Sequence, residues 1–118
     1  MSGASARLGF ARPQRVLKAS EFEAVYARRR RVLDSFFAVN FAPNELGRAR
    51  LGLSVGAKTV GNSVARNRVK RLVRESFRHI AADLPAFDLV VGARNGVKTA
   101  HNARLRESLD GLWKQVQK

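Results

Sequence analysis

The chain has 118 residues and no cysteine, which excludes a disulfide scaffold and any metal site with cysteine ligands. Lysine and arginine number 23 against 9 for aspartate and glutamate, so the formal net charge is +14 at pH 7. Because such a charge repels itself unless a polyanion such as a phosphate backbone neutralises it, the composition indicates a nucleic-acid-binding protein.

The amino-terminal segment, residues 1–15, is rich in glycine, serine and arginine, which predicts a flexible basic arm. Its beginning has no long apolar stretch, so we expect no secretory signal. No later window approaches the roughly 18 uninterrupted apolar residues of a membrane helix. We therefore expect a cytoplasmic protein whose single folded domain covers residues 16–118.

The first half of the domain predicts a short helix and several strands. A Ser-x-x-Glu capping box opens the helix, which we expect over 20–28, and the four arginines at 28–31 should face solvent. Alternating apolar residues predict strands over 36–42 and 48–55, with a further short strand through 32–33. The first of these strands is apolar on both faces, which indicates either a covering helix or a surface on which bases stack.

The strongest helical pattern runs from residue 62 to residue 80. Apolar side chains at helical spacing form one side: Ala65, Val69, Leu72, Val73, Phe77 and Ile80. Polar and basic side chains form the other: Asn67, Lys70, Arg71, Arg74 and Arg78, with Arg66 and Arg68 at the two borders. A strand over 87–93 and an amphipathic helix over 103–116 complete the domain, which predicts a sheet packed against helices.

The basic side of this helix suits a phosphate backbone. Cations at i, i+3 and i+4 project about 5–6 Å apart, and arginine grips a phosphate with a planar fork of donors. Asn67 can reach a sugar hydroxyl or a base edge, and the free amides near Asn62 form a further anion site. A merely solvated basic face is the alternative, but Glu75 is the only acid between Lys58 and Ile80, where solvated helices usually mix charges. The pattern indicates RNA or DNA and does not distinguish them.

The order of residues in this region narrows the interpretation. Residues 58–77, centred on Arg66-Asn67-Arg68 and continued by Lys70-Arg71 and Arg74-Glu75, closely resemble the signature of the bacterial ribonuclease P protein family. The resemblance extends over roughly residues 15–116. It implies an α+β fold: a two-layer α/β sandwich whose four-stranded sheet has a left-handed βαβ crossover, of the ribosomal protein S5 domain 2-like type.

The same resemblance implies a function. The chain would be the protein subunit of ribonuclease P, which binds the catalytic RNA and the 5′ leader of precursor tRNA and assists endonucleolytic removal of the leader. The RNA would perform catalysis with Mg²⁺ that it mainly binds itself, so we expect no catalytic residue, metal site or cofactor in the protein, and neither membrane nor DNA as a partner. The expected RNA contacts are Lys58, Asn62, Arg66, Asn67, Arg68, Lys70, Arg71 and Arg74. The expected residues of the leader-binding cleft are Phe22, Tyr26, Phe36 and Val39.

Alternatives remain open at this point. Aromatic residues on a short helix more often pack in a core, so Phe22 and Tyr26 can be structural. A ribosomal-type protein that binds rRNA fits the composition equally well, and a DNA-binding module fits less well because no helix-turn-helix partner or dimer surface is evident. The scattered carboxylates argue against a protein nuclease, and Glu75 is expected to pair with Arg71 or Arg74 rather than to act as a catalyst.

Overall fold

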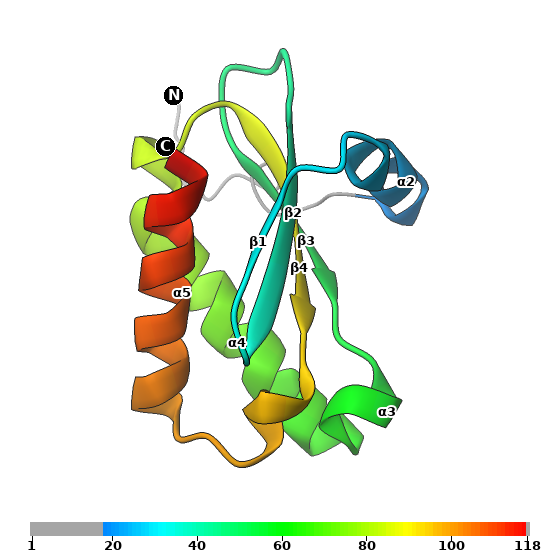
Figure 1. Cartoon of the computed structure of the whole chain (residues 1–118), viewed down its shortest axis with the longest axis vertical. Helices are drawn as coiled ribbons and strands as arrows, with labels where there is room; N and C mark the ends of the chain where they lie inside the picture. Colours follow the sequence, from blue (N-terminus) through cyan, green and yellow to red (C-terminus); the bar gives the residue numbers. More distant parts are fainter. Residues whose placement is uncertain (1–17, 118) are drawn as a thin grey trace, which may run out of the picture.

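Four strands form one sheet in the computed structural model, which describes residues 18–117 (Figure 1). The strands are β1 (Arg31–Leu33), β2 (Phe37–Pro43), β3 (Arg50–Ser54) and β4 (Phe87–Ala93). The helices are α2 (Ala19–Ala27), α3 (Ala57–Val60), α4 (Ser63–Ile80) and α5 (Asn102–Gln117), with the short 3-10 turns η1 (Ala81–Asp83) and η2 (Asn95–Lys98). The predicted arm over residues 1–15 lies outside the described residues.

The sheet combines antiparallel and parallel pairs in the order β1-β2-β4-β3. Strand β2 pairs antiparallel with both β1 and β4, whereas β3 pairs parallel with β4. The chain passes from β3 to β4 through α3 and α4, so this parallel pair forms a βαβ crossover. A mixed four-stranded sheet packed with helices confirms the predicted α+β class, and the left hand of the crossover stays a prediction.

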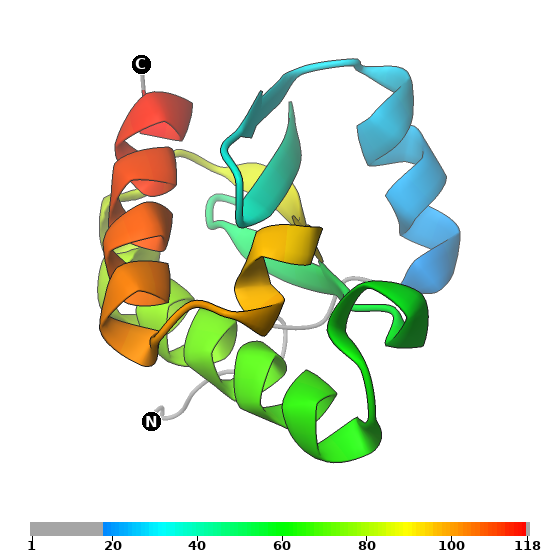
Figure 2. The ribbon, with the colours of Figure 1, turned by 60° about the horizontal axis from the view of Figure 1, so that its bottom comes forward.

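The two faces of the sheet carry different layers (Figure 2). Phe37, Val39 and Phe41 alternate along β2 and are buried on the face covered by α4 and α5. On the opposite face, Ala42 of β2 packs in a smaller cluster with Val25 of α2. The larger core thus lies between the sheet and the helix pair α4–α5, and α2 packs on the other side.

Helix α4 begins where the sequence predicts. Asn62 has an extended backbone, and its Oδ1 accepts a hydrogen bond from the Ala65 amide at 2.9 Å, which satisfies one of the free amides of the first turn. The residues of α4 that are buried in the core are Val69, Leu72, Val73 and Phe77. These observations confirm the helix predicted over 62–80, with its apolar side turned inward.

Helix α2 begins differently from the prediction. Lys18 is the N-cap residue, and Oε1 of Glu21 reaches back to accept a hydrogen bond from the Lys18 amide at 2.7 Å. The predicted capping box of Ser20 and Glu23 is therefore wrong, because Ser20 already lies inside the helix. The other oxygen of Glu21 accepts a hydrogen bond from Arg50 of β3 at 3.1 Å, a tertiary contact that the local sequence does not show.

Polar side chains fix α5 in addition to its apolar stripe. Trp113 Nε1 donates a hydrogen bond to Ser76 Oγ of α4 at 2.8 Å. Ser108 Oγ donates to Asp34 Oδ2 at 2.5 Å, while Asp34 Oδ1 accepts the amides of Phe36 and of Phe37, the first residue of β2. Helix α5 is therefore anchored to α4 on one side and to the β1–β2 connection on the other.

Candidate nucleic-acid interface

Helix α4 presents a cationic surface on the side away from the core. Asn67, Arg71 and Arg74 are exposed, whereas Arg66 and Arg68 at the two borders are partly buried. Lys70 is also partly buried. Because none of these predicted contact residues is fully buried and the segment is helical, the predicted orientation of the helix is confirmed.

A groove of about 520 Å³ runs along α4 beside α5. Its lining residues are Val64, Asn67, Arg68, Arg71, Leu72, Glu75, Asn102 and Arg106. The groove brings three predicted contact residues, Asn67, Arg68 and Arg71, together with Arg106, a cation of α5 that sequence reasoning missed. The amphipathic pattern of α5 indicated that Arg106 is exposed, but it contained no signal for which helix would lie beside it.

Arg68 is held in a fixed orientation toward α5. Its Nη1 donates to Oδ1 of Asn102 at 2.6 Å, and its Nη2 donates to the carbonyl of Val97 at 3.4 Å. Since arginine has five N–H donors, these bonds orient the guanidinium and leave other donors free for a phosphate. At the other border, Nε of Arg66 is buried with no hydrogen-bond partner within residues 18–117, so a phosphate contact there falls to its terminal nitrogens.

The cations of α4 have no acidic partners in the described part of the chain. The ion pairs found there join Arg50 to Glu21 and Asp88, and Arg104 to Glu107. The pair predicted between Glu75 and Arg71 or Arg74 is therefore wrong, and Glu75 instead lines the groove beside α5. The positive charges of α4 remain available to a polyanion.

An aromatic pair lies on the opposite side of the sheet, on α2. The ring centroids of Phe22 and Tyr26 are 6.4 Å apart, and the ring planes meet at 87°. Phe22 packs against Val25, Ala42 and Val90, whereas Tyr26 keeps 42% of its surface exposed. The core role considered for both aromatic residues thus applies to Phe22, and Tyr26 offers an accessible ring.

A partly buried network of charged groups attaches α2 to the sheet. Arg50 donates hydrogen bonds to both carboxylate oxygens of Asp88, at 2.9 and 2.8 Å, and Asn44 donates to the same carboxylate at 2.8 Å. Hydrogen bonding to Asp88 is the main cause that raises the pKa of Arg50. Burial alone would raise the pKa of Asp88, but the hydrogen bonds from Arg50 and Asn44 and the charge of Arg50 lower it below its ordinary value. The hydrogen bond from the Lys18 amide is the main cause that lowers the pKa of Glu21, which also binds Arg50.

Beyond α2, the same side of the sheet carries several accessible residues. Alternation along the strands places Arg31 of β1 and its cross-strand partner Asn40 of β2 on this side. Gly92 of β4 pairs with Ala38 and Ser54 of the neighbouring strands. Because glycine has no side chain, the backbone of the sheet is not covered by a side chain at this position. We call the surface formed by α2 and these sheet residues the α2 face.

Comparison with known proteins now decides the family. The Ribonuclease P family model matches residues 10–117. A ribonuclease P protein component from Chromohalobacter salexigens is 43% identical over 111 residues, which cover 93% of this chain and 87% of that protein. One from Escherichia coli O157:H7 is 40% identical over 109 residues, which cover 92% of both chains. The chain belongs to the ribonuclease P protein family.

Solved ribonuclease P proteins share the fold. The Staphylococcus aureus RNase P protein superimposes with a TM-score of 0.82 at 32% identity, covering 89% of this chain and 98% of that one. The Thermotoga maritima RNase P protein gives a TM-score of 0.78 at 29% identity, covering 88% and 98%. The shared fold agrees with membership of the ribonuclease P protein family, so the alternative of a ribosomal-type protein that binds rRNA is set aside.

The residues expected in the leader cleft of a ribonuclease P protein do not all share one surface. Val39 is 0% exposed in the main core, so its expected place in the cleft is wrong. The reason is the period of two along β2, which puts Val39 in one row with Phe37 and Phe41, facing α4 and α5. Phe36 precedes β2 and packs against the same core, with the guanidinium of Arg104 from α5 at 5.0 Å from its ring centroid. Phe36 therefore also lies apart from the aromatic pair of α2.

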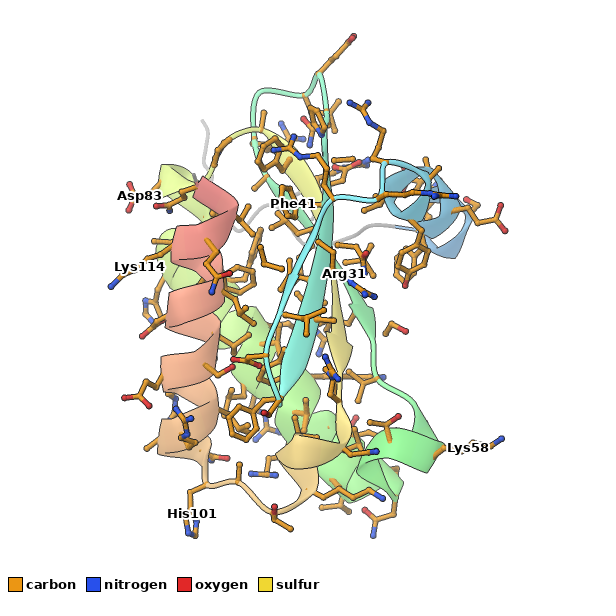
Figure 3. All side chains as sticks on the ribbon, viewed as in Figure 1. Arg31, Phe41, Lys58, Asp83, His101 and Lys114 are labelled. Carbon is orange, nitrogen blue, oxygen red and sulfur yellow. The ribbon has the colours of Figure 1, made fainter. Side chains whose placement is uncertain are left out.

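Two further residues expected to bind RNA lie before the cationic surface of α4. Lys58 belongs to α3 and projects into solvent (Figure 3). Asn62 is exposed, but its Oδ1 is engaged in capping α4, which leaves its amide nitrogen for an external acceptor. RNA contacts through these two residues stay predictions.

Proposed function

We propose that this chain, as the non-catalytic protein subunit of ribonuclease P, binds the catalytic RNA through α4 and the 5′ leader of precursor tRNA through the α2 face. It thereby assists the endonucleolytic removal of the leader that gives the mature 5′ end. Membership of the family supports a role in tRNA 5′ processing. The observation that supports two separate RNA sites is that α4 and α2 lie on opposite sides of one sheet (Figures 1 and 2). Helix α4 lines the cationic groove, and α2 carries the aromatic pair.

The contact with the catalytic RNA depends on unpaired charge at regular spacing. Arg71 and Arg74 are three residues apart, so their side chains project about 5–6 Å from each other, close to the spacing of neighbouring phosphates. Arg68 is already oriented by Asn102, and Arg106 adds a cation from α5. Each phosphate that these groups neutralise releases condensed counterions, which favours binding most strongly at low salt.

The contact with the leader depends on an accessible ring at a fixed position. The exposed ring of Tyr26 can stack on an unpaired base, and stacking tolerates any base because every base has a π face. Phe22 and the bonds of Arg50 to Glu21 and Asp88 hold α2 against the sheet, so they position Tyr26 without touching RNA. A surface that binds any base suits leaders of differing sequence.

Cleavage itself is proposed to belong to the RNA, with Mg²⁺ bound mainly by RNA. In residues 18–117 no group of three or more His, Cys, Asp or Glu side chains could hold a metal ion.

A cytoplasmic location is proposed as well. None of the helices within this part of the chain is long and apolar enough to cross a lipid bilayer.

Reconstitution with a matched catalytic RNA tests the proposal. The purified protein alone should not cleave precursor tRNA, and at low Mg²⁺ it should restore cleavage by the RNA. The preference for precursor over mature tRNA should appear only when the protein is present. Cleavage by the protein alone, or RNA activity that the protein leaves unchanged, would overturn the proposed function.

A further inference from the structure

Four consecutive arginines, residues 28–31, connect the end of α2 to the first position of β1, and we call them the arginine turn. All four side chains are exposed. None of them takes part in an ion pair among residues 18–117. The turn is therefore a second cationic surface, separate from α4. Because adjacent like charges repel one another unless an anion lies nearby, this surface favours a bound anion.

Arg29 has a backbone conformation that favours glycine. Its φ is 57°, in the left-handed region, and it is the one residue other than glycine with positive φ in the described part of the chain. The amides of Arg28 and Arg29 bond back to the carbonyls of Val25 and Tyr26 at 3.2 and 3.0 Å, so the turn closes α2. Helices that end in this way usually place glycine here, because a Cβ is disfavoured in the left-handed region. Local folding does not explain an arginine at this position, which points to a role for its charge.

The other end of the turn is fixed on the sheet. The guanidinium of Arg30 lies 4.8 Å from the ring centroid of Phe41 and 5.4 Å from that of Phe87, two rings on the side of the sheet that carries α4 and α5. The Arg30 carbonyl accepts the Phe41 amide at 3.0 Å, so Arg30 anchors the turn. Arg31 pairs with Asn40 in the β1–β2 ladder, on the α2 side of the sheet (Figure 3). Because both ends are anchored, the turn loses little conformational freedom when it binds a ligand.

We propose that Arg28, Arg29 and Arg31 of the arginine turn bind the phosphates of leader nucleotides that extend beyond the α2 face, while Arg30 anchors the turn on the other side of the sheet. This inference rests on the proposed function, because it assumes that the leader lies on that face. Tyr26 is exposed in the last turn of α2, directly before the arginine turn, while α4 lies on the other side of the sheet (Figure 1). A single strand that stacks on Tyr26 reaches the arginine turn by continuing along α2. A favourable interaction with the α2 helix dipole accounts for a cation at this end, but not for four.

The test compares two variants that each remove two positive charges. The first, R28Q/R29G, removes charge from the turn and places glycine where φ is 57°. The control, R104Q/K114Q, removes charge from exposed positions of α5. Each variant is reconstituted with the catalytic RNA. Affinities are then measured for mature tRNA and for precursors whose leaders are lengthened one nucleotide at a time.

We expect the two variants to diverge only for long leaders. R28Q/R29G should match the wild type for mature tRNA and for the shortest leaders, and should lose roughly two- to twenty-fold affinity once the leader reaches the turn. The slope of log affinity against log salt for long leaders should fall by about 1.4, because two single-strand phosphate contacts are lost. The control should follow the wild type at every length, and the melting temperature of R28Q/R29G should not be lower than that of the wild type.

Other outcomes separate this inference from the proposed function. An equal loss at every leader length, mature tRNA included, would overturn the inference, because the turn would then contact another part of the complex. Unchanged affinity at all lengths would overturn it too. If the wild type itself does not prefer precursor over mature tRNA, the proposed function fails instead. Should R28Q/R29G melt early, R28Q alone, which keeps the backbone of the turn, decides the question by the same length series.

Discussion

Replacing Asp88 by asparagine should loosen α2 from the sheet while preserving the shape of the side chain. Arg50 donates to both oxygens of Asp88 at 2.9 and 2.8 Å, and an amide offers only one oxygen, so Arg50 keeps Glu21 as its single charged partner. Hydrogen bonds to charged groups contribute about 1.5–3 kcal/mol. The two side chains are only 17% and 14% exposed, so screening by water is limited. We therefore expect the free energy of unfolding to fall by about 2 kcal/mol, or the melting temperature by about 8 °C.

The pH dependence of this loss identifies its cause. The pKa of Asp88 is lowered in the folded protein, so its stabilising contribution is present above the unfolded value of about 4 and is lost as pH falls through the folded pKa. Protonated aspartic acid resembles asparagine, so the stabilities of the wild type and D88N should converge in acid. Urea unfolding followed by circular dichroism between neutral and acidic pH measures both curves. A difference that stays constant across this range would refute the electrostatic explanation.

A matched control and a functional readout complete this experiment. D110N changes an exposed carboxylate of α5 that has no hydrogen-bond or ion-pair partner within residues 18–117, and should alter stability by less than about 0.5 kcal/mol. In the reconstituted enzyme, D88N should reduce the preference for precursor over mature tRNA, because α2 positions Tyr26. Its affinity for the catalytic RNA should stay unchanged. Equal losses in both assays would contradict a positioning role.

Three further substitutions test the two surfaces and the core. R71A should weaken binding to the catalytic RNA and lower the salt slope by about 0.9, one phosphate contact, whereas R104A should change neither; titrations at several salt concentrations compare them. Y26A should reduce the preference for precursors with leaders by about tenfold, the loss of one stacked base, and leave affinity for the catalytic RNA intact in competition assays. V39A should lower the free energy of unfolding by about 2 kcal/mol through a cavity, without changing leader preference. A leader-specific defect in V39A would contradict a purely structural role for Val39 in the core.

Local patterns predicted most of the elements. The helix expected over 62–80 is found as Ser63–Ile80, and the strand expected over 87–93 is found with the same bounds. A helical or strand period depends only on residues close together in the sequence, so it can be recognised wherever one side of an element faces a core. The cationic side of α4 could be predicted for the same reason.

Predictions were wrong where a side chain contacts a residue that is distant in the sequence. Glu21, rather than Glu23, caps α2, and Arg50 of β3 binds its second oxygen. Glu75 lines the groove beside α5 and forms no ion pair with Arg71 or Arg74 within residues 18–117. The residues that a known motif names can be found in the sequence, but the groups that orient them come from elsewhere in the chain.

By itself the sequence determined the excess of positive charge, the amphipathic helix that displays it and the resemblance to one family. Only the tertiary structure decided which surfaces exist: Arg106 beside Arg68 and Arg71, and Tyr26 on the face opposite Val39. The strand order β1-β2-β4-β3 and the packing of α5 on α4 depend on contacts between residues far apart in the chain. A local period records whether a side chain is buried, but not which element buries it.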